Sequence, residues 1–81
     1  MESENRIAVV GILISDGESV ESVNAALHDM SEFVRGRMGL PLRDRNLNAI
    51  TLVLDAPADA INRLAGRLGK ISGVSAKVMY R

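Results

Sequence analysis

The chain has 81 residues, 47% of them hydrophobic, so residues 1–81 can form one small domain and the composition argues against a disordered chain. It has no cysteine and one histidine, His28, which excludes a disulfide, a cysteine-ligated zinc site and a multi-histidine metal cage within one chain. Its net charge is zero, and one phenylalanine and one tyrosine are too few for the stacking platforms that bind single-stranded nucleic acid.

Nothing near the start of the chain combines the basic residues, apolar stretch and small-residue cleavage site of a signal peptide. No apolar run approaches the roughly 18 residues that a membrane-spanning helix needs. We therefore expect a cytoplasmic protein that makes no membrane contact.

The first half of the chain predicts a strand followed by a helix. Residues 1–5 are polar, and we expect them to be frayed. Residues 6–15 are rich in β-branched side chains and predict the first strand. Ser15 or Asp16 can then cap a helix by accepting hydrogen bonds from its free N–H groups. From residue 19 to about residue 34, apolar side chains recur at spacings of three and four, which predicts an amphipathic helix with an acidic outer face.

A hairpin is predicted in the middle of the chain. Residues 35–42 contain two glycines and a proline, which favour an irregular edge strand because proline cannot donate a ladder hydrogen bond. These residues either shape a bend or form a loop whose N–H groups hold an anion. A polar turn at 43–46 joins them to residues 47–54, which predict a second strongly apolar strand.

The second helix is predicted to begin at Asp55-Ala56-Pro57, with Asp55 near the cap and Pro57 in the first turn, where its missing N–H costs nothing. Gly69 is expected to end this helix in a left-handed conformation. After a turn at Ser72-Gly73, residues 74–80 alternate between apolar and mostly polar side chains, which is typical of an edge strand.

The order β-α-β-β-α-β predicts an α+β, ferredoxin-like fold. Its sheet has four antiparallel strands in the order 4-1-3-2, with two helices on one face. Residues 7–14 and 47–54 are apolar on both alternating faces, as expected of the two central strands. Two helices cover only one face, so the other face predicts association, as a homodimer or tetramer or with a different protein partner.

Charge is unevenly distributed along the chain. Residues 1–32 carry seven acidic side chains and one arginine, for a net charge of −6, whereas residues 33–81 carry nine basic and three acidic side chains, for +6. Two interpretations remain open. Either two solvated helices of opposite sign attract each other within the fold, or a basic surface awaits an anionic partner.

Three segments resemble a family of small bacterial ACT-like proteins described as regulators of the iron-only hydrogenase system. They are Leu27-His28 with Ser31-Glu32, the stretch Gly36-Arg37-Met38-Gly39-Leu40-Pro41-Leu42-Arg43, and Leu68-Gly69-Lys70-Ile71-Ser72-Gly73-Val74. The similarity runs from Ile7 to Tyr80. It implies a ferredoxin-like fold, a homo-oligomer and a regulatory role.

The wider ACT resemblance also implies a ligand site. In many ACT domains an amino acid binds near the first strand–helix loop, at an interface between subunits, where an aspartate and a glycine approach it. Asp16 and Gly17 occupy that loop here, although the usual proline before the glycine is absent. Nickel-responsive regulators with ACT-like domains use several histidines and a cysteine, and this chain departs from that pattern.

Two further residues are candidate ligand contacts. His28 lies at the edge of the first helix's apolar stripe, beside Asn24 and Ser31, and is either a plain surface residue or a contact at a subunit junction. Arg37 is one of four arginines near the hairpin. They either protect a sheet edge by their charge or recognise a carboxylate or phosphate.

No catalytic residue, cofactor or resident metal is predicted. The single histidine has no evident triad partner, and neither a P-loop nor a Rossmann fingerprint is present. An acidic first helix and the lack of a DNA-binding motif argue against direct DNA binding. The sequence thus favours a non-enzymatic ACT-like regulatory or ligand-sensing module that works as a homo-oligomer and binds a metabolite or a protein partner. The ACT resemblance implies that such a metabolite is amino-acid-like. The alternative is a structural module that assembles a partner enzyme or maturation factor without sensing a ligand.

Overall fold

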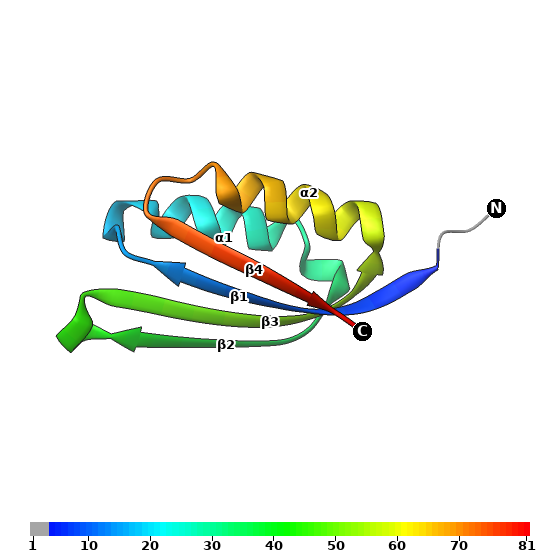
Figure 1. The fold of residues 1–81 in the computed structure, drawn as a ribbon, viewed down its shortest axis with the longest axis horizontal. Helices are drawn as coiled ribbons and strands as arrows, with labels where there is room; N and C mark the ends of the chain where they lie inside the picture. The colour runs from blue at the N-terminus through cyan, green and yellow to red at the C-terminus, as the bar shows by residue number, and fades with distance from the viewer. Residues whose placement is uncertain (1–3) are drawn as a thin grey trace.

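A computed structural model describes residues 4–81. Four strands and two α-helices follow one another along this part of the chain (Figure 1). They are β1 (Asn5–Ile14), α1 (Val20–His28), β2 (Val34–Leu42), β3 (Leu47–Pro57), α2 (Ala58–Gly69) and β4 (Val74–Tyr80), with short 3-10 turns at Gly17–Ser19, Ser31–Phe33 and Arg43–Arg45.

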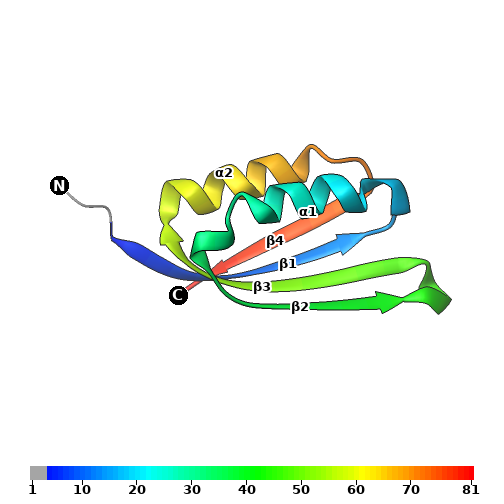
Figure 2. The same cartoon turned by 180° about the vertical axis from the view of Figure 1, so that it is seen from behind.

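The four strands form one antiparallel sheet in the order β2-β3-β1-β4, which is the predicted order read from the other edge. Both helices lie on the same side of the sheet, α2 over the β4 side and α1 over the β2 side (Figures 1 and 2). The predicted ferredoxin-like fold is therefore confirmed, with β1 and β3 in the centre.

The core lies between the helices and the inner face of the sheet, meaning the face that the helices cover. Alternate residues of β1 and β3 point into it, because side chains alternate between the two faces of a strand. From the strands it buries Ala8, Val10, Ile12, Ile14, Ile50, Leu52, Leu54 and Ala56. The helices contribute Val23, Ala26, Leu27, Ala60, Ile61, Leu64 and Leu68, as their apolar spacing predicts.

The first helix is shorter than predicted. The expected helix to about residue 34 is wrong, because α1 ends at His28 and Val34 already belongs to β2. There Val34 pairs with Leu54, so β3 is still paired with β2 at this end, along the edge of β3 that does not pair with β1. A β-branched residue such as valine fits a strand at least as well as a helix. Met30 lies just after α1 and stays buried, so the apolar spacing continues although the helix does not.

The start of the second helix also differs from the prediction. Asp55 is not a helix cap, since β3 continues to Pro57 and Asp55 pairs with Ile7 of β1. β1 itself begins at Asn5, inside the segment expected to be frayed, and residues 1–3 of that segment lie outside the described residues. Because β1 and β3 pair over this greater length, α2 begins only at Ala58, and Pro57 is its N-cap residue.

The edge strand β2 is irregular, as predicted. Its register against β3 shifts between Val34 and Gly36, which marks a β-bulge. Pro41 lies on this edge strand, opposite Asn48. The bulge places Arg35 beside Asp55, with 3.3 Å between Nη2 and Oδ2, and its exposed position makes this a weak ion pair.

One ion pair connects the two helices across their outer surfaces. Nη1 of Arg67 on α2 donates to Oδ2 of Asp29, the residue after α1, at 2.6 Å. This hydrogen bond, and then the positive charge of Arg67, hold the pKa of Asp29 below its ordinary value of 3.8. Attraction between acidic and basic helices, one of the two open interpretations of the charge pattern, is thus observed at this pair.

We expect Arg67→Met to raise the pKa of Asp29 towards 3.8, because the hydrogen bond and the charge are both removed. Since the folded-state pKa is lowered, the pair stabilises the fold above the unfolded pKa and loses this effect as the pH falls through the folded pKa. NMR titration of the Asp29 carboxyl group measures the shift, with Arg63→Met as a control for removal of a neighbouring charge. An unchanged pKa of Asp29 in Arg67→Met would show that Arg67 is not the cause of the lowered value.

Candidate functional site

A cleft of about 710 Å³ lies between α1 and the inner face of β2. Its floor is apolar and formed by Leu27, Val34 and Leu52, whereas its rim is polar. On the rim α1 contributes Glu21, Asn24 and His28, followed by Ser31, and β2 contributes Arg37. Two of the four predicted ligand residues, His28 and Arg37, therefore line the same cleft although they belong to different elements.

Arg37 is positioned by the register of the sheet. It pairs with Leu52, whose side chain is fully buried under the helices, so Arg37 also points to the inner face. Its Nη2 donates to Oδ1 of Asn24 at 2.7 Å, which fixes the guanidinium at the rim. A guanidinium has five N–H donors, and this one bond leaves the others to bind a carboxylate or phosphate.

The remaining rim residues follow from the helical repeat. Glu21, Asn24 and His28 are three and four residues apart, so they lie along one edge of α1 beside its buried stripe. His28 is exposed in one copy of the chain and lies with Asn24 and Ser31 on the rim of the cleft. Sequence reasoning missed Glu21 and Asn24 as site residues, although this spacing relative to His28 was a signal for both.

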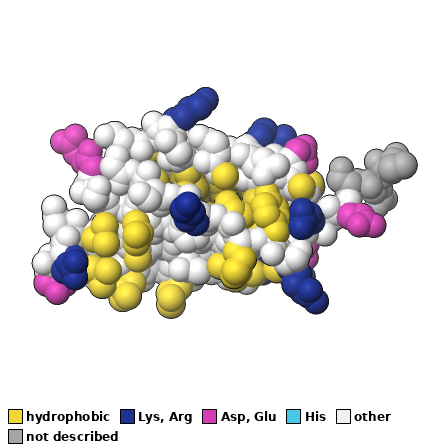
Figure 3. Space-filling model, in the orientation of Figure 1, with side chains coloured by type: hydrophobic (Ala, Val, Ile, Leu, Met, Phe, Trp, Pro, Cys, Tyr) yellow, Lys and Arg dark blue, Asp and Glu magenta, His cyan; other side chains and the backbone are white. Residues whose placement is uncertain are grey.

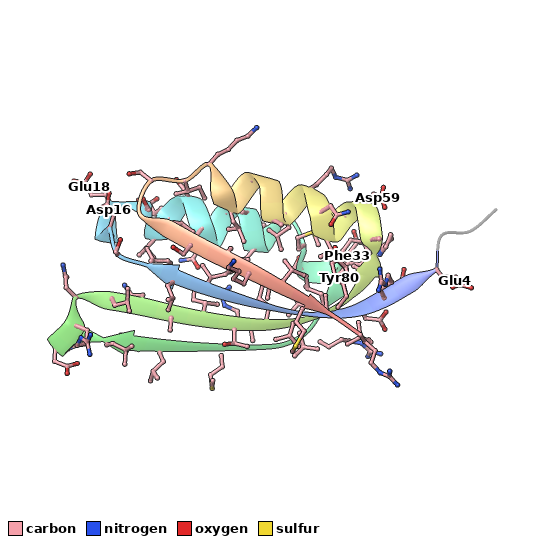
Figure 4. All side chains as sticks on the ribbon, viewed as in Figure 1. Glu4, Asp16, Glu18, Phe33, Asp59 and Tyr80 are labelled. Atoms are coloured by element: carbon pink, nitrogen blue, oxygen red, sulfur yellow. The ribbon has the colours of Figure 1, made fainter. Side chains whose placement is uncertain are left out.

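Asp16 and Gly17 lie apart from this cleft. They form the connection before α1, whereas His28 is the last residue of that helix. Figure 4 shows Asp16 and Glu18 at the opposite end of the molecule from Phe33, which follows α1 closely in the chain. The four predicted ligand residues thus form two separate pairs in one copy of the chain.

Asp16 has a clear local role. Its Oδ1 accepts a hydrogen bond from the N–H of Glu18 at 3.0 Å, so Asp16 is the predicted N-cap, here of the short turn that precedes α1. The same connection is tied to the segment before β4. The N–H of Ser15 donates to the carbonyl oxygen of Gly73 at 2.8 Å. The hydroxyl of Ser19 donates to the backbone carbonyl oxygen of Ser72 at 2.6 Å.

Gly69 does not have the left-handed conformation predicted for it. It is the last residue of α2, and Gly73 instead has a positive φ of 72°. A Cβ on Gly73 would lie 2.6 Å from the Cβ of Asp16. Gly73 therefore allows the close approach that fixes the Asp16–Gly17 connection.

The face of the sheet away from the helices, here called the outer face, is largely apolar. Side chains that pair across strands share a face, so the register assigns Ile7 and Leu13 of β1, Met38 and Leu40 of β2, and Met79 of β4 to it. Within residues 4–81 these five are the exposed large hydrophobic side chains, with exposed fractions between 41% and 65%. Figure 3 shows hydrophobic side chains along the lower edge of the molecule, on the side away from the helices, and others between β4 and α2.

A second groove, of about 670 Å³, runs between the two helices. Met30 and Leu64 line it, and Arg67 lies at its rim. The Arg67 guanidinium already binds Asp29, and none of the predicted ligand residues reaches this groove. The α1–β2 cleft is the better candidate site.

Among residues 4–81, no three histidine, aspartate or glutamate side chains are grouped so that they could hold a metal ion. No helix in the same range has both the length and the apolar composition needed to cross a membrane.

The fold and its strand order define an ACT-like, ferredoxin-like domain. The chain belongs to the TM1266-like family, described as "Iron-only hydrogenase system regulator, putative", whose family model matches residues 6–78. The predicted resemblance is therefore confirmed. A comparison with curated proteins gave no match.

Solved structures agree with this assignment. The uncharacterized protein TM1266 from Thermotoga maritima is 37% identical, with a TM-score of 0.91, over 95% of this chain and 98% of that one. The ACT domain from the GTP pyrophosphokinase of Chlorobium tepidum has a TM-score of 0.78 at 14% identity, over 93% of this chain and 99% of that one. The C-terminal domain of MgtC from Mycobacterium tuberculosis has a TM-score of 0.74 at 16% identity, over 100% and 93%. The last two similarities concern the fold alone.

Proposed function

We propose that this chain is a small, non-enzymatic regulatory module that works as a homo-oligomer and binds an amino-acid-like metabolite in the α1–β2 cleft. The observation that carries the proposal is that Arg37 and His28, which belong to different elements, line the same cleft above an apolar floor. The family description links the module to the iron-only hydrogenase system.

The charges of the cleft suit an amino acid. Arg37 can bind the α-carboxylate through the guanidinium N–H groups that Asn24 does not use. Glu21 lies on the same rim and supplies a negative charge for the α-ammonium group. Val34 on the floor, which is half-buried, and Ala25 of α1, which is exposed, provide the apolar contact that a small aliphatic side chain needs.

The alternative function, a structural module that assembles a partner enzyme or maturation factor, is favoured by one observation. The outer face exposes large apolar side chains, which suits protein association whether or not a ligand binds. The two functions differ in the role of the cleft, since only the regulatory module needs Arg37 there.

Thermal unfolding with a panel of amino acids, nucleotides and inorganic phosphate tests the proposal. A ligand at about ten times its Kd stabilises the folded state by about 1.4 kcal/mol, which raises Tm by roughly 5–10 °C for a domain of this size. We expect an amino acid, and neither nucleotide nor phosphate, to give this shift.

Arg37→Met is expected to weaken binding at least about tenfold, because a charged hydrogen bond contributes about 1.5–3 kcal/mol. Arg43→Met removes the same charge from the hairpin turn, outside the cleft, and is expected to leave the Tm shift unchanged. If no amino acid shifts Tm, or if Arg37→Met responds as the unaltered protein does, the cleft is not the sensing site. The assembly function is then preferred.

A further inference from the structure

Gly11 has no structural reason to be a glycine within a single copy of the chain. It lies in the middle of the central strand β1, where a glycine weakens the strand and offers no side chain to pack. A Cβ built on it meets nothing within 4 Å, and its φ is not in the positive region that favours glycine. A valine would fit this position in the monomer and favour the strand.

The register places Gly11 on the outer face, between Thr51 of β3 and Lys77 of β4. The missing side chain leaves a hollow of about 260 Å³, lined also by Leu13 and Ala49. A glycine within a strand often marks a place where another molecule approaches the backbone closely. The observation therefore points to an occupant above this face.

We propose that the outer face packs against the outer face of a second copy of this chain, and that an apolar side chain of each copy enters the Gly11 hollow of the other. The proposal rests on the proposed function only in that it names the surface that joins the homo-oligomer. It does not depend on a ligand in the α1–β2 cleft.

A second copy fits because the outer face carries both a hollow, at Gly11, and protruding apolar side chains that could fill such a hollow. In a two-fold interface the same patch faces itself, so each hollow must be matched by a protrusion on the same surface. Met38 and Met79 are 64% and 65% exposed and stand on the strands at either edge of this face. Methionine is flexible and common at adaptable interfaces, so these side chains can fill an irregular hollow.

The charges of this face do not oppose self-association. Asp55 already pairs with Arg35 at 3.3 Å. Lys77 lines the Gly11 hollow and belongs to the edge strand β4, so its apolar stem can pack beside the entering side chain while its ammonium group stays in water. No net repulsion across the centre of the interface is therefore expected.

The size of the face also suits a small dimer interface. Four strands spaced about 4.8 Å apart and paired over roughly seven residues give about 20 Å by 25 Å, or about 500 Å² of flat area per copy. Stable interfaces bury about 800 Å² of accessible surface per partner, and a corrugated face has more accessible surface than its flat area. We expect a dimer at the small end of this range, with dissociation in the micromolar range.

The test compares Gly11→Val with Gly39→Val in sedimentation experiments on the whole chain. Gly39 also has open space around its Cβ position, but it pairs with Ile50 and so faces the inner side of the sheet. We expect Gly11→Val to weaken self-association at least about tenfold, because the new side chain fills the hollow. Gly39→Val is expected to associate as the unaltered protein does.

Circular dichroism checks that both variants fold, and Met38→Glu on the same face is a second variant expected to weaken association in the same way. Association of Gly11→Val and Met38→Glu at the strength of the unaltered protein would overturn the proposal. The proposal would also be overturned if the unaltered protein stayed monomeric, even if a different protein covered the outer face. Loss of the ligand-dependent Tm shift with association intact would instead count against the proposed function alone.

Discussion

Replacing Gly73 with alanine is expected to destabilise the fold by about 2–5 kcal/mol. A left-handed backbone costs a residue with a Cβ about 1–2 kcal/mol, and φ at Gly73 is 72°. The new Cβ would also lie 2.6 Å from the Cβ of Asp16, so the connection before α1 would have to shift at a further cost of about 1–3 kcal/mol. Equilibrium urea unfolding measures the loss.

Gly69→Ala is the matched control for this substitution. Gly69 has neither a positive φ nor an atom within 4 Å of its Cβ position, and it ends α2. Alanine there is expected to leave stability unchanged or to raise it by up to about 1 kcal/mol, because glycine is a poor helix former. If both variants lost the same free energy of unfolding, the close approach of Gly73 to Asp16 would not be the cause of the loss in Gly73→Ala.

Neighbouring residues on β1 are expected to respond differently to the same truncation. Ile12 is 1% exposed on the inner face, so Ile12→Ala should cost about 2–5 kcal/mol at every protein concentration. Leu13 lies on the outer face and is half-exposed in one copy. Leu13→Ala should therefore cost little in dilute solution.

Concentration distinguishes the two faces. A partner that binds only the folded chain stabilises it by mass action, so the stability of the unaltered protein is expected to rise with its own concentration. Ile12→Ala should retain this rise, whereas Leu13→Ala should reduce it. Urea unfolding at two protein concentrations measures both effects. A loss at Leu13→Ala that is large and independent of concentration would contradict an outer face that is open in the monomer.

The fold was predictable because its periodic segments are long and consistent with one another. β1 and β3 are apolar on both faces, and right-handed connections then leave the order 4-1-3-2 for the four strands. The errors lie at the ends of elements, where long-range pairing overrides local sequence. Asp55 and Pro57 have the composition of a helix start, but pairing with β1 keeps both in a strand.

The candidate site was only partly predictable. His28 and Arg37 were each recognisable by residue type, yet their meeting in one cleft depends on the register of β2 against β3 and on the early end of α1. A β-bulge before Arg37 sets which face it occupies, and no sequence signal located that bulge to a single residue. Asp16 carried a capping signal, and that is the role it has in the fold.

Sedimentation equilibrium of the unaltered chain, from about 1 to 100 µM, tests the central claim that this is an associating module with a covered outer face. At micromolar Kd the weight-average mass should rise across this range towards at least twice the 8.7 kDa of one chain. A single 8.7 kDa species at every concentration would contradict the claim.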